Sequence, residues 1–518
     1  MALATGGASL SIAAGVREFA RATPAAVAVI DGDRRQTYAE LDERSSRLAQ
    51  ALLAGGLGPG DPVAVLLGNR LEYCEIAAGL AKAGLPLVPL NPRMTGPEVD
   101  YVVGHSGARA LILDEALSGA AAASSGGLDR VLSIGGESLG PAYEPALAGA
   151  DARDPHLMVD ERQPFCIAYT SGTTGRPKGV LISHRSRVLT FYASALEWGL
   201  GTGRRSIAVA PMYHGAGFAF GYTPVFTGGT ISMLRAWNPE ALLEMIQRDQ
   251  AQSVFLVPTH AQMIKSLGDD VLRGYDLSSL DTLYFNAAAL PVALKEWVLD
   301  AFPGVGVHEL YGSTEGGIIT NLRPADARRK AGSVGHPWYM TEVRVVDDEG
   351  QPVAPGEPGE LFSRSPYLMN GYLNDPEATA ACTTDDGFLT CGDVVTVDDE
   401  GFIRIVDRKK DLIISGGVNV YPRDVEEAVL RHPSVVEVAV VGVPHETWGE
   451  TVVAYVVAKP GEALGVDELD AHLRPLLAAY KIPKQVVAVA ALPRNAAGKV
   501  LKRDLRDQHA EIPPGEPA

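Results

Sequence analysis

The chemistry of this chain is easiest to identify in residues 169–180, which read Tyr-Thr-Ser-Gly-Thr-Thr-Gly-Arg-Pro-Lys-Gly-Val. Three glycines let the backbone bend and bring N–H groups close to a ligand. Hydroxyl groups add hydrogen-bond donors, and Arg176 and Lys178 add positive charge. The segment follows an apolar run at 165–168, which predicts a strand. The combination predicts a polyphosphate-binding loop, although it lacks the Gly-Lys-Ser/Thr of a Walker loop.

Five later segments carry residue types that suit a nucleotide or its chemistry. Taken singly, each has a structural explanation: a packing turn, a helix cap, a tight turn, a solvated linker or a surface lysine. Their order and number favour function over those explanations. The segments are Asn-Ala-Ala-Ala-Leu-Pro at 286–291, Leu-Tyr-Gly-Ser-Thr-Glu-Gly at 310–316, Thr-Cys-Gly-Asp at 390–393, Asp-Arg-Lys-Lys-Asp-Leu-Ile at 407–413, and Pro-Arg-Asn-Ala-Ala-Gly-Lys at 493–499.

These six segments resemble, in order, the signature motifs of the adenylate-forming enzymes, in the branch of acyl-CoA synthetases and fatty acid–CoA ligases. The resemblance extends from residue 37 to about residue 506. It implies an α/β fold with a large N-terminal domain, residues 1–409, built from two parallel α/β layered subdomains and a small β-barrel-like subdomain. It also implies a small, mobile α+β C-terminal domain, residues 410–518, which carries the catalytic lysine.

The resemblance also implies roles for individual residues. Among those expected to bind the nucleotide, Tyr311 would give adenine an aromatic face and Asp393 would accept hydrogen bonds from the ribose hydroxyls. Glu315 and Thr170 are expected at a Mg²⁺ ion, since hard cations favour such oxygens, and Glu315 and Lys178 are expected to be catalytic. The full expected nucleotide set is Thr170, Ser171, Gly172, Thr173, Thr174, Asn286, Ala287, Ala288, Tyr311, Gly312, Thr314, Asp393 and Arg408.

Two positions depart from the family pattern. Asn286 stands where Gly or Ser is more usual, and Cys391 stands where Thr is usual if the alignment is anchored on the following Gly-Asp. We keep Asp393 as a candidate and give Cys391 no role.

The C-terminal motifs imply a reaction in two halves. Lys499 is the expected catalytic lysine for attack of a carboxylate on the α-phosphorus of ATP, which forms an acyl-adenylate and pyrophosphate. Lys410 is the expected pivot between the domains. After rotation, Ser415, Gly416 and Gly417 would line the path of the coenzyme A pantetheine arm, because adjacent glycines occupy no side-chain volume.

Residues 211–218, Pro-Met-Tyr-His-Gly-Ala-Gly-Phe, resemble the region that flanks the acyl pocket. His214 occupies the place of an aromatic residue that gates carboxylate access in the family, and is also expected to be catalytic. No aspartate is present for an amino-acid ammonium group, and no arginine for a second carboxylate. A hydrophobic fatty, alicyclic or aryl acid is therefore expected, with its contacts at Tyr213, His214, Gly215, Gly217, Phe218 and Gly316.

Other functions remain open at this stage. An aryl- or cinnamoyl-CoA ligase is the nearest alternative, and a carrier-protein acyl ligase would differ in its thiol acceptor. A luciferase-like oxygenase would share every motif. The alternative from another class is an inactive nucleotide-binding module, against which the joint presence of Glu315, Asp393, Arg408 and Lys499 argues.

Composition and net charge limit the kinds of partner that the protein is expected to bind. The 518 residues carry 45 basic and 63 acidic side chains, a net charge of −18. Nucleic acid is therefore not expected as a partner, and anionic substrates must meet local cations and N–H groups. The four cysteines have no metal-ligand spacing, and no run reaches the length of a transmembrane helix. A cytoplasmic protein is expected, and a homodimer is compatible with the sequence.

The elements that must position these motifs follow from apolar periodicity. Helices are expected at 37–57, 72–83 and 240–250 and strands at 62–67, 85–90 and 253–257, an alternation that indicates parallel α/β layers. Short strands follow at 342–346, 360–362, 394–397 and 402–406, which indicate a small antiparallel unit. The C-terminal domain is expected to hold helices near 423–431 and 466–480 and strands at 435–443, 451–457 and 485–491.

Overall fold

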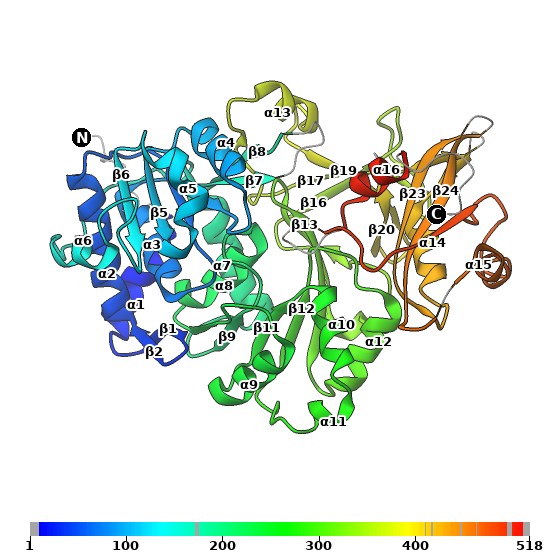
Figure 1. Ribbon diagram of the computed structural model, residues 1–518, viewed down its shortest axis with the longest axis horizontal. Helices are drawn as coiled ribbons and strands as arrows, with labels where there is room; N and C mark the ends of the chain where they lie inside the picture. The colour runs from blue at the N-terminus through cyan, green and yellow to red at the C-terminus, as the bar shows by residue number, and fades with distance from the viewer. Residues whose placement is uncertain are drawn as a thin grey trace.

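The computed structural model describes residues 10–170, 176–409, 411–415, 418–445, 448–462, 464–494 and 500–510. Figure 1 shows a large part, in which helices cover two sheets, and a smaller part at the end of the molecule away from the N-terminus. The predicted fold class, a large α/β domain followed by a small α+β domain, is confirmed.

The first large sheet has nine strands in the order β15-β14-β13-β12-β11-β9-β10-β1-β2. Its central strands run parallel, and antiparallel pairs close both edges. Every residue of β11, Ser-Val-Phe-Leu, is buried, as expected of a strand covered on both faces. The strands are β1 Val27–Asp31, β2 Arg34–Thr37, β9 Arg205–Ala208, β10 Thr230–Met233, β11 Ser253–Leu256, β12 Thr282–Phe285, β13 Gly306–Ser313, β14 Gly317–Leu322 and β15 His336–Pro337.

The second large sheet has seven strands in the order β18-β8-β7-β4-β3-β5-β6. It is parallel from β6 to β7 and ends in the antiparallel strands β8 and β18. The strands are β3 Val63–Leu66, β4 Leu87–Leu90, β5 Ala110–Asp114, β6 Arg130–Ile134, β7 Pro164–Thr170, β8 Lys178–Ser183 and β18 Gly371–Tyr372.

Some helices of the large part begin at a side-chain cap, as α2 does, whereas others, such as α3, do not. The predicted helix at 37–57 spans residues 38–54, because Thr37 forms a capping box with Glu40. The predicted helix at 72–83 starts one residue earlier, and its residues are all buried. The helices are α1 Ala14–Ala22, α2 Tyr38–Ala54, α3 Leu71–Ala83, α4 Gly96–Ser106, α5 Ser118–Ser125, α6 Tyr143–Ala148, α7 His184–Trp198, α8 Gly215–Phe226, α9 Pro239–Asp249, α10 Pro258–Ser266, α11 Asp269–Leu272, α12 Val292–Ala301 and α13 Pro376–Cys382.

The expected small β unit is a four-stranded antiparallel sheet in the order β16-β17-β19-β20. One strand has the predicted bounds of 342–346, and the other three extend beyond the predicted runs because polar residues continue the pairing. They are β16 Glu342–Val346, β17 Gly359–Arg364, β19 Leu389–Val397 and β20 Ile403–Arg408.

The C-terminal part is a five-stranded sheet, β22-β21-β24-β23 with β25 paired to β24. The predicted helix at 466–480 ends at Leu473, since Pro475 has no N–H with which to continue the helical hydrogen bonds. The predicted strand at 485–491 ends at Ala488, where its pairing with β24 stops. The elements are β21 Ile413–Ser415, β22 Val418–Val420, α14 Pro422–Val429, β23 Val435–His445, β24 Gly449–Ala458, α15 Val466–Leu473, β25 Gln485–Ala488 and α16 Lys502–Ala510.

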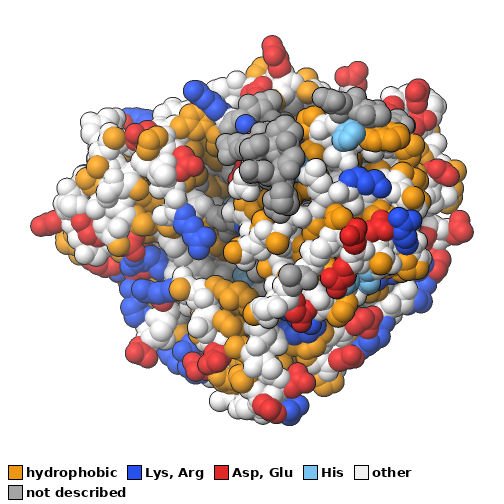
Figure 2. All heavy atoms as spheres, turned by 45° about the vertical axis from the view of Figure 1, so that its right-hand side comes forward, with side chains coloured by type: hydrophobic (Ala, Val, Ile, Leu, Met, Phe, Trp, Pro, Cys, Tyr) orange, Lys and Arg blue, Asp and Glu red, His pale blue; other side chains and the backbone are white. Residues whose placement is uncertain are grey.

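On the face drawn in Figure 2, acidic and basic side chains are interspersed. Among the described residues, no helix is long and apolar enough to cross a bilayer.

Candidate active site

The predicted phosphate loop joins two antiparallel strands. Thr170 at the end of β7 pairs with Lys178 at the start of β8, so these two strands form a hairpin, which lies next to the edge strand β18 of the second sheet. The predicted ligands Ser171, Gly172, Thr173 and Thr174 lie outside the described residues.

Helix α4 holds both ends of this loop. The Tyr101 hydroxyl donates to the Pro177 carbonyl at 2.9 Å, and the Arg176 guanidinium lies 5.6 Å from the Tyr101 ring centre. On the other side, Nδ1 of His105 and the Tyr169 hydroxyl are hydrogen-bonded at 2.7 Å. Sequence reasoning missed these α4 residues, because a helical Tyr-x-x-x-His pattern carries no nucleotide signal.

The two predicted metal ligands meet. The Thr170 hydroxyl donates to Oε1 of Glu315 at 3.3 Å across 145 residues of sequence. Glu315 lies in the turn between β13 and β14, a second hairpin tip. The Tyr372 hydroxyl donates to the same Oε1 at 3.2 Å. Sequence reasoning missed Tyr372, because the short strand β18 that carries it has no nucleotide signal.

Tyr372 also connects Glu315 with Lys178. The Lys178 ammonium lies 5.1 Å from the Tyr372 ring centre and 3.3 Å from Oδ2 of Asp375. Burial, and next the charge of Glu315, raise the pKa of the Tyr372 hydroxyl. Tyr372 therefore stays a neutral donor at neutral pH.

The donor set at Glu315 fits Mg²⁺ rather than a transition metal. Over the described parts of the chain, no group of three or more His, Cys, Asp or Glu residues could hold a metal ion. Mg²⁺ is commonly bound by one or two carboxylates together with substrate phosphates and waters. The Glu315 carboxylate and its neighbouring hydroxyls supply oxygen atoms of the type that such a site uses.

Three of the expected nucleotide ligands form one chain of contacts. The Tyr311 hydroxyl donates to Oδ2 of Asp393 at 2.5 Å, and Nε of Arg408 lies 3.1 Å from Oδ1 of the same carboxylate. Tyr311 and Asp393 are buried, at 8% and 4% exposure. Burial, and next the charge of Asp393, raise the pKa of Tyr311. Gly312 follows Tyr311 at a close backbone approach, where a Cβ would lie 2.0 Å from the Gly317 carbonyl oxygen.

Cys391 has a structural role that the sequence did not indicate. Its Sγ lies 3.0 Å from the Ser313 hydroxyl, which accepts the Gly316 N–H at 2.8 Å. Burial, and next the charge of Glu315, raise the pKa of Cys391 to about 12, so it is a neutral thiol. The contact ties β19 to the turn that carries Thr314 and Glu315.

The predicted adenine turn is strained and anchored. Ala287 has φ of +73°, which non-glycine residues seldom adopt, and its N–H donates to Asn286 Oδ1 at 2.6 Å. At the far end of the turn, the Leu290 N–H donates to Oε1 of Glu309 at 3.1 Å, and Glu309 pairs with Lys295 in the core. Asn286 is half-buried, whereas Ala287 and Ala288 are exposed. The turn therefore presents backbone to an open surface.

The predicted acyl segment begins helix α8. A Cβ on Gly215 would lie 3.8 Å from the Thr314 hydroxyl, so the start of α8 adjoins the Thr-Glu turn. His214 is the N-cap residue; burial lowers its pKa, and its Nε2 has no hydrogen-bond partner among the described residues. Tyr213 and Gly215 are half-buried beside it, whereas Gly316 is buried.

Gly217 and Phe218 contribute to packing. A Cβ on Gly217 would lie 1.9 Å from the Pro211 carbonyl oxygen, so only glycine fits this close approach. The buried Phe218 ring packs against Phe165 and Tyr222. Their small size and apolar character are thus explained by the core, and contact with the acid stays a prediction for both.

The motifs of the small domain are only partly described. Ser415 lies in β21, paired with Val418 and Gly449. Lys410, Gly416, Gly417 and Lys499 lie outside the described residues.

Comparisons with known proteins show which family the chain resembles. A model of the AMP-binding enzyme family matches residues 16–373, and one of the AMP-binding enzyme C-terminal domain matches residues 424–499. A feruloyl-CoA synthase from an Amycolatopsis species is 40% identical over 491 residues, which are 94% of this chain and 96% of the relative. The 2-succinylbenzoate–CoA ligase of Geobacillus kaustophilus is 36% identical over 495 residues, 95% of this chain and 96% of the relative.

Among solved structures, an o-succinylbenzoate CoA synthetase from Bacillus subtilis, in complex with its acyl-adenylate intermediate, matches with a TM-score of 0.85 and 29% identity. The match covers 97% of this chain and 99% of that one. The chain belongs to the AMP-binding enzyme family, and the prediction of an AMP-forming acid–CoA ligase is thereby confirmed.

Proposed function

We propose that this ligase activates a hydrophobic carboxylic acid as its acyl-adenylate and then transfers the acyl group to the thiol of coenzyme A. Two sets of contacts support the assignment of its site. Thr170 is hydrogen-bonded to Glu315. Asp393 accepts a hydrogen bond from Tyr311 and forms an ion pair with Arg408. Hydrogen bonds and an ion pair join these residues although they come from separate stretches of the chain.

In the first half-reaction, a carboxylate oxygen forms a bond to the α-phosphorus of ATP, and the bond from that phosphorus to pyrophosphate breaks. Both reactants are anionic, so neutralising charge is the main requirement. Lys178 and Lys499 are the proposed cations, and Glu315 and Thr170 are the proposed holders of Mg²⁺. When bound, Mg²⁺ supplies positive charge to the phosphate oxygens.

In the second half-reaction, the thiol sulfur bonds to the acyl carbon, the bond to AMP breaks, and the thiol proton passes to solvent. The proposed domains are residues 1–409 and 410–518, with Lys410 as pivot. Rotation would remove Lys499 and bring Ser415, Gly416 and Gly417 to the pantetheine arm.

The acid is proposed to enter beside His214 and Tyr213. No Asp or Arg occurs in 211–218, which disfavours amino acids and diacids. Burial lowers the pKa of His214, so the ring is neutral at pH 7 and suits an uncharged acyl group. An aryl acid of the cinnamate type is the second candidate, favoured by the 40% identity to a feruloyl-CoA synthase.

The test is a coupled assay of AMP release across acids that vary in chain length and ring content. AMP formation that requires both an acid and coenzyme A supports the proposal, and the best acid on the panel separates fatty from aryl substrates. Acid-dependent pyrophosphate exchange without transfer to coenzyme A would point to a carrier-protein acceptor. ATP binding without turnover on any acid would refute the proposal.

A further inference from the structure

The side chain of Asn69 connects the two large sheets. Asn69 lies in the loop between β3 and α3 of the second sheet and is 6% exposed. Its Nδ2 lies within hydrogen-bond distance of three carbonyl oxygens of the first sheet, those of Ala208 at 3.0 Å, Ala210 at 3.1 Å and Leu234 at 3.2 Å. Its Oδ1 accepts the Met212 N–H at 2.7 Å.

These contacts demand a carboxamide. Two N–H donors face three acceptors, and one carbonyl faces one donor, which only Asn or Gln can supply. Gln is one methylene longer, and the site is buried, so the added volume would have to displace backbone. The local geometry therefore requires asparagine.

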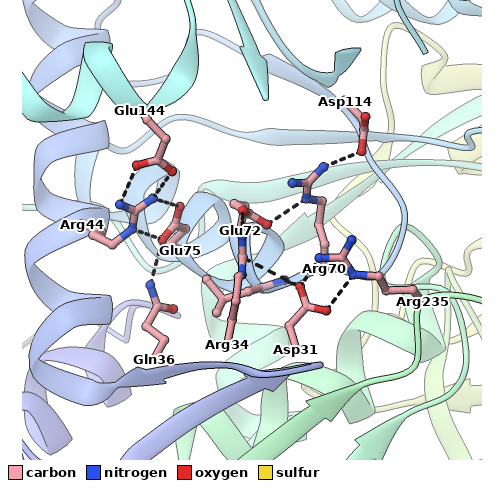
Figure 3. Close-up of polar contacts among 11 residues, drawn as sticks. Asp31, Arg34, Gln36, Arg44, Arg70, Glu72, Glu75, Asp114, Glu144 and Arg235 are labelled. Atoms are coloured by element: carbon pink, nitrogen blue, oxygen red, sulfur yellow. Dashed lines mark hydrogen bonds and ion pairs between the residues drawn. The ribbon is translucent and has the colours of Figure 1, made fainter. Parts of the chain in front are cut away.

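Asp31 forms a second connection close to Asn69, between the loop after β10 and the start of α3. Figure 3 shows Arg235, the residue after Leu234, turned toward Asp31 at the end of β1. Arg235 binds Asp31 through two contacts of 2.7 Å, and Asp31 Oδ2 also accepts the Leu71 N–H at 3.1 Å. The loop after β10 is thus bound by Asn69 at Leu234 and by Asp31 at Arg235, and these contacts fix the position of the Leu234 carbonyl.

The position of Met212 bears on the acid. Tyr213 and His214 follow Met212 directly, and the His214 N–H donates to the Pro211 carbonyl at 3.0 Å. Helix α8 begins at Gly215, beside Thr314. Because the Met212 N–H donates to Asn69, this contact determines where His214 lies relative to the turn that carries Thr314 and Glu315.

We infer that Asn69 is a positioning residue for the carboxylic acid, which acts by fixing the Met212 backbone and through it Tyr213 and His214. This inference rests on the proposed function, in which the acid enters beside these two residues. Asn69 touches neither the acid nor ATP. Its loss would misplace the acid and leave the nucleotide contacts at Asp393 and Glu315 intact.

The first test compares Asn69→Ala with Asn321→Ala. Asn321 is also buried, at 2% exposure, and its amide pairs with His308. We expect Asn69→Ala to raise KM for the acid roughly ten- to hundredfold and to leave KM for ATP within about twofold. Asn321→Ala should leave KM for the acid unchanged. Equal changes in both KM values, or equal behaviour of the two variants, would overturn the inference.

A second variant gives a readout that packing alone would not produce. In Asn69→Asp, a carboxylate still accepts from Met212 but can donate to a carbonyl only when protonated. We expect its KM for the acid, relative to wild type, to fall as the pH is lowered from 8 to 6. If the ratio of the variant's KM for the acid to the wild-type KM does not change with pH, the positioning role of Asn69 is contradicted.

Hydrogen exchange measured on the free protein does not depend on catalysis. Peptides that span 209–216 should exchange faster in Asn69→Ala, whereas peptides that span 317–322 should not. Unchanged exchange at 209–216 would overturn the inference even if no substrate is found. If the wild-type protein activates no acid while the exchange result holds, the proposed function fails and the structural part of the inference stands.

Discussion

Tyr372 donates a hydrogen bond of 3.2 Å to Oε1 of Glu315, the same oxygen that accepts from Thr170. The three side chains come from β18, from the turn after β13 and from the end of β7. Two hydroxyl donors on one oxygen fix the orientation of the carboxylate proposed to hold Mg²⁺.

Tyr372→Phe should therefore impair the metal-dependent step. The change removes only the hydroxyl and keeps the ring beneath Lys178. A hydrogen bond to a charged group is worth about 1.5–3 kcal/mol, so we expect at least a roughly tenfold fall in adenylation rate and a higher Mg²⁺ requirement, measured by pyrophosphate exchange against Mg²⁺ concentration. The matched control is Tyr367→Phe, a buried tyrosine whose hydroxyl has no partner among the described residues. Full activity of Tyr372→Phe at low Mg²⁺ would contradict the role.

Lys499→Ala should separate the two half-reactions. Removing one charge that stabilises the transition state commonly costs on the order of 10²–10³ in rate. We expect adenylate formation, followed by pyrophosphate exchange, to fall by at least that factor, while thiol transfer from supplied acyl-AMP is retained. A variant that exchanges pyrophosphate at the wild-type rate would refute the assignment of Lys499.

Lys410→Pro should have the opposite effect. Proline fixes φ near −65°, so it restricts rotation at the proposed pivot. We expect adenylation to continue and acyl transfer to coenzyme A to fall. Lys410→Ala serves as control, since alanine keeps the backbone free. Equal loss of both half-reactions in the proline variant would discard the pivot.

Arg44 should contribute strongly to stability. It binds the fully buried Glu75 through contacts of 2.6 and 3.0 Å and also reaches Glu144, as Figure 3 shows. Arg44→Met leaves Glu75 charged and short of partners, which typically costs roughly 3 kcal/mol in the free energy of unfolding. Urea denaturation measures this loss of unfolding free energy. Arg153→Ala, which breaks an exposed pair with Asp151, should leave the denaturation midpoint unchanged.

Glu72 should make the fold acid-sensitive. Burial alone would raise its pKa, but hydrogen bonds from Arg70 and Arg34 outweigh burial and lower the pKa from 4.5 to about 2. Because the folded-state pKa is depressed, the stabilisation is full above the unfolded pKa and is lost as pH falls from about 5 toward 2.

The variant Glu72→Gln removes this titration. Its free energy of unfolding should fall less steeply than that of wild type between pH 5 and pH 2.5, measured by urea denaturation at each pH. Parallel curves for the two proteins would show that Glu72 does not contribute to the acid sensitivity.

The sequence alone was sufficient to predict the family and the fold class, and it contains the motifs in their family order. Local signals explain this success. Thr37 and Glu40 encode a helix start in four residues, and the Gly-rich segment at 169–180 carries a local pattern typical of phosphate-binding loops. Apolar runs predicted the strands because parallel strands are covered on both faces.

What the tertiary structure decided is which side chains meet. Tyr372 became part of the site only when β18 paired with β8, and Asn69 acquired its partners only when the two sheets packed together. The same packing gave Gly217 and Phe218 a role in the core. Hydrogen bonds between residues 57 or 143 positions apart leave no local pattern in sequence, because they depend on distances that only the assembled sheets define.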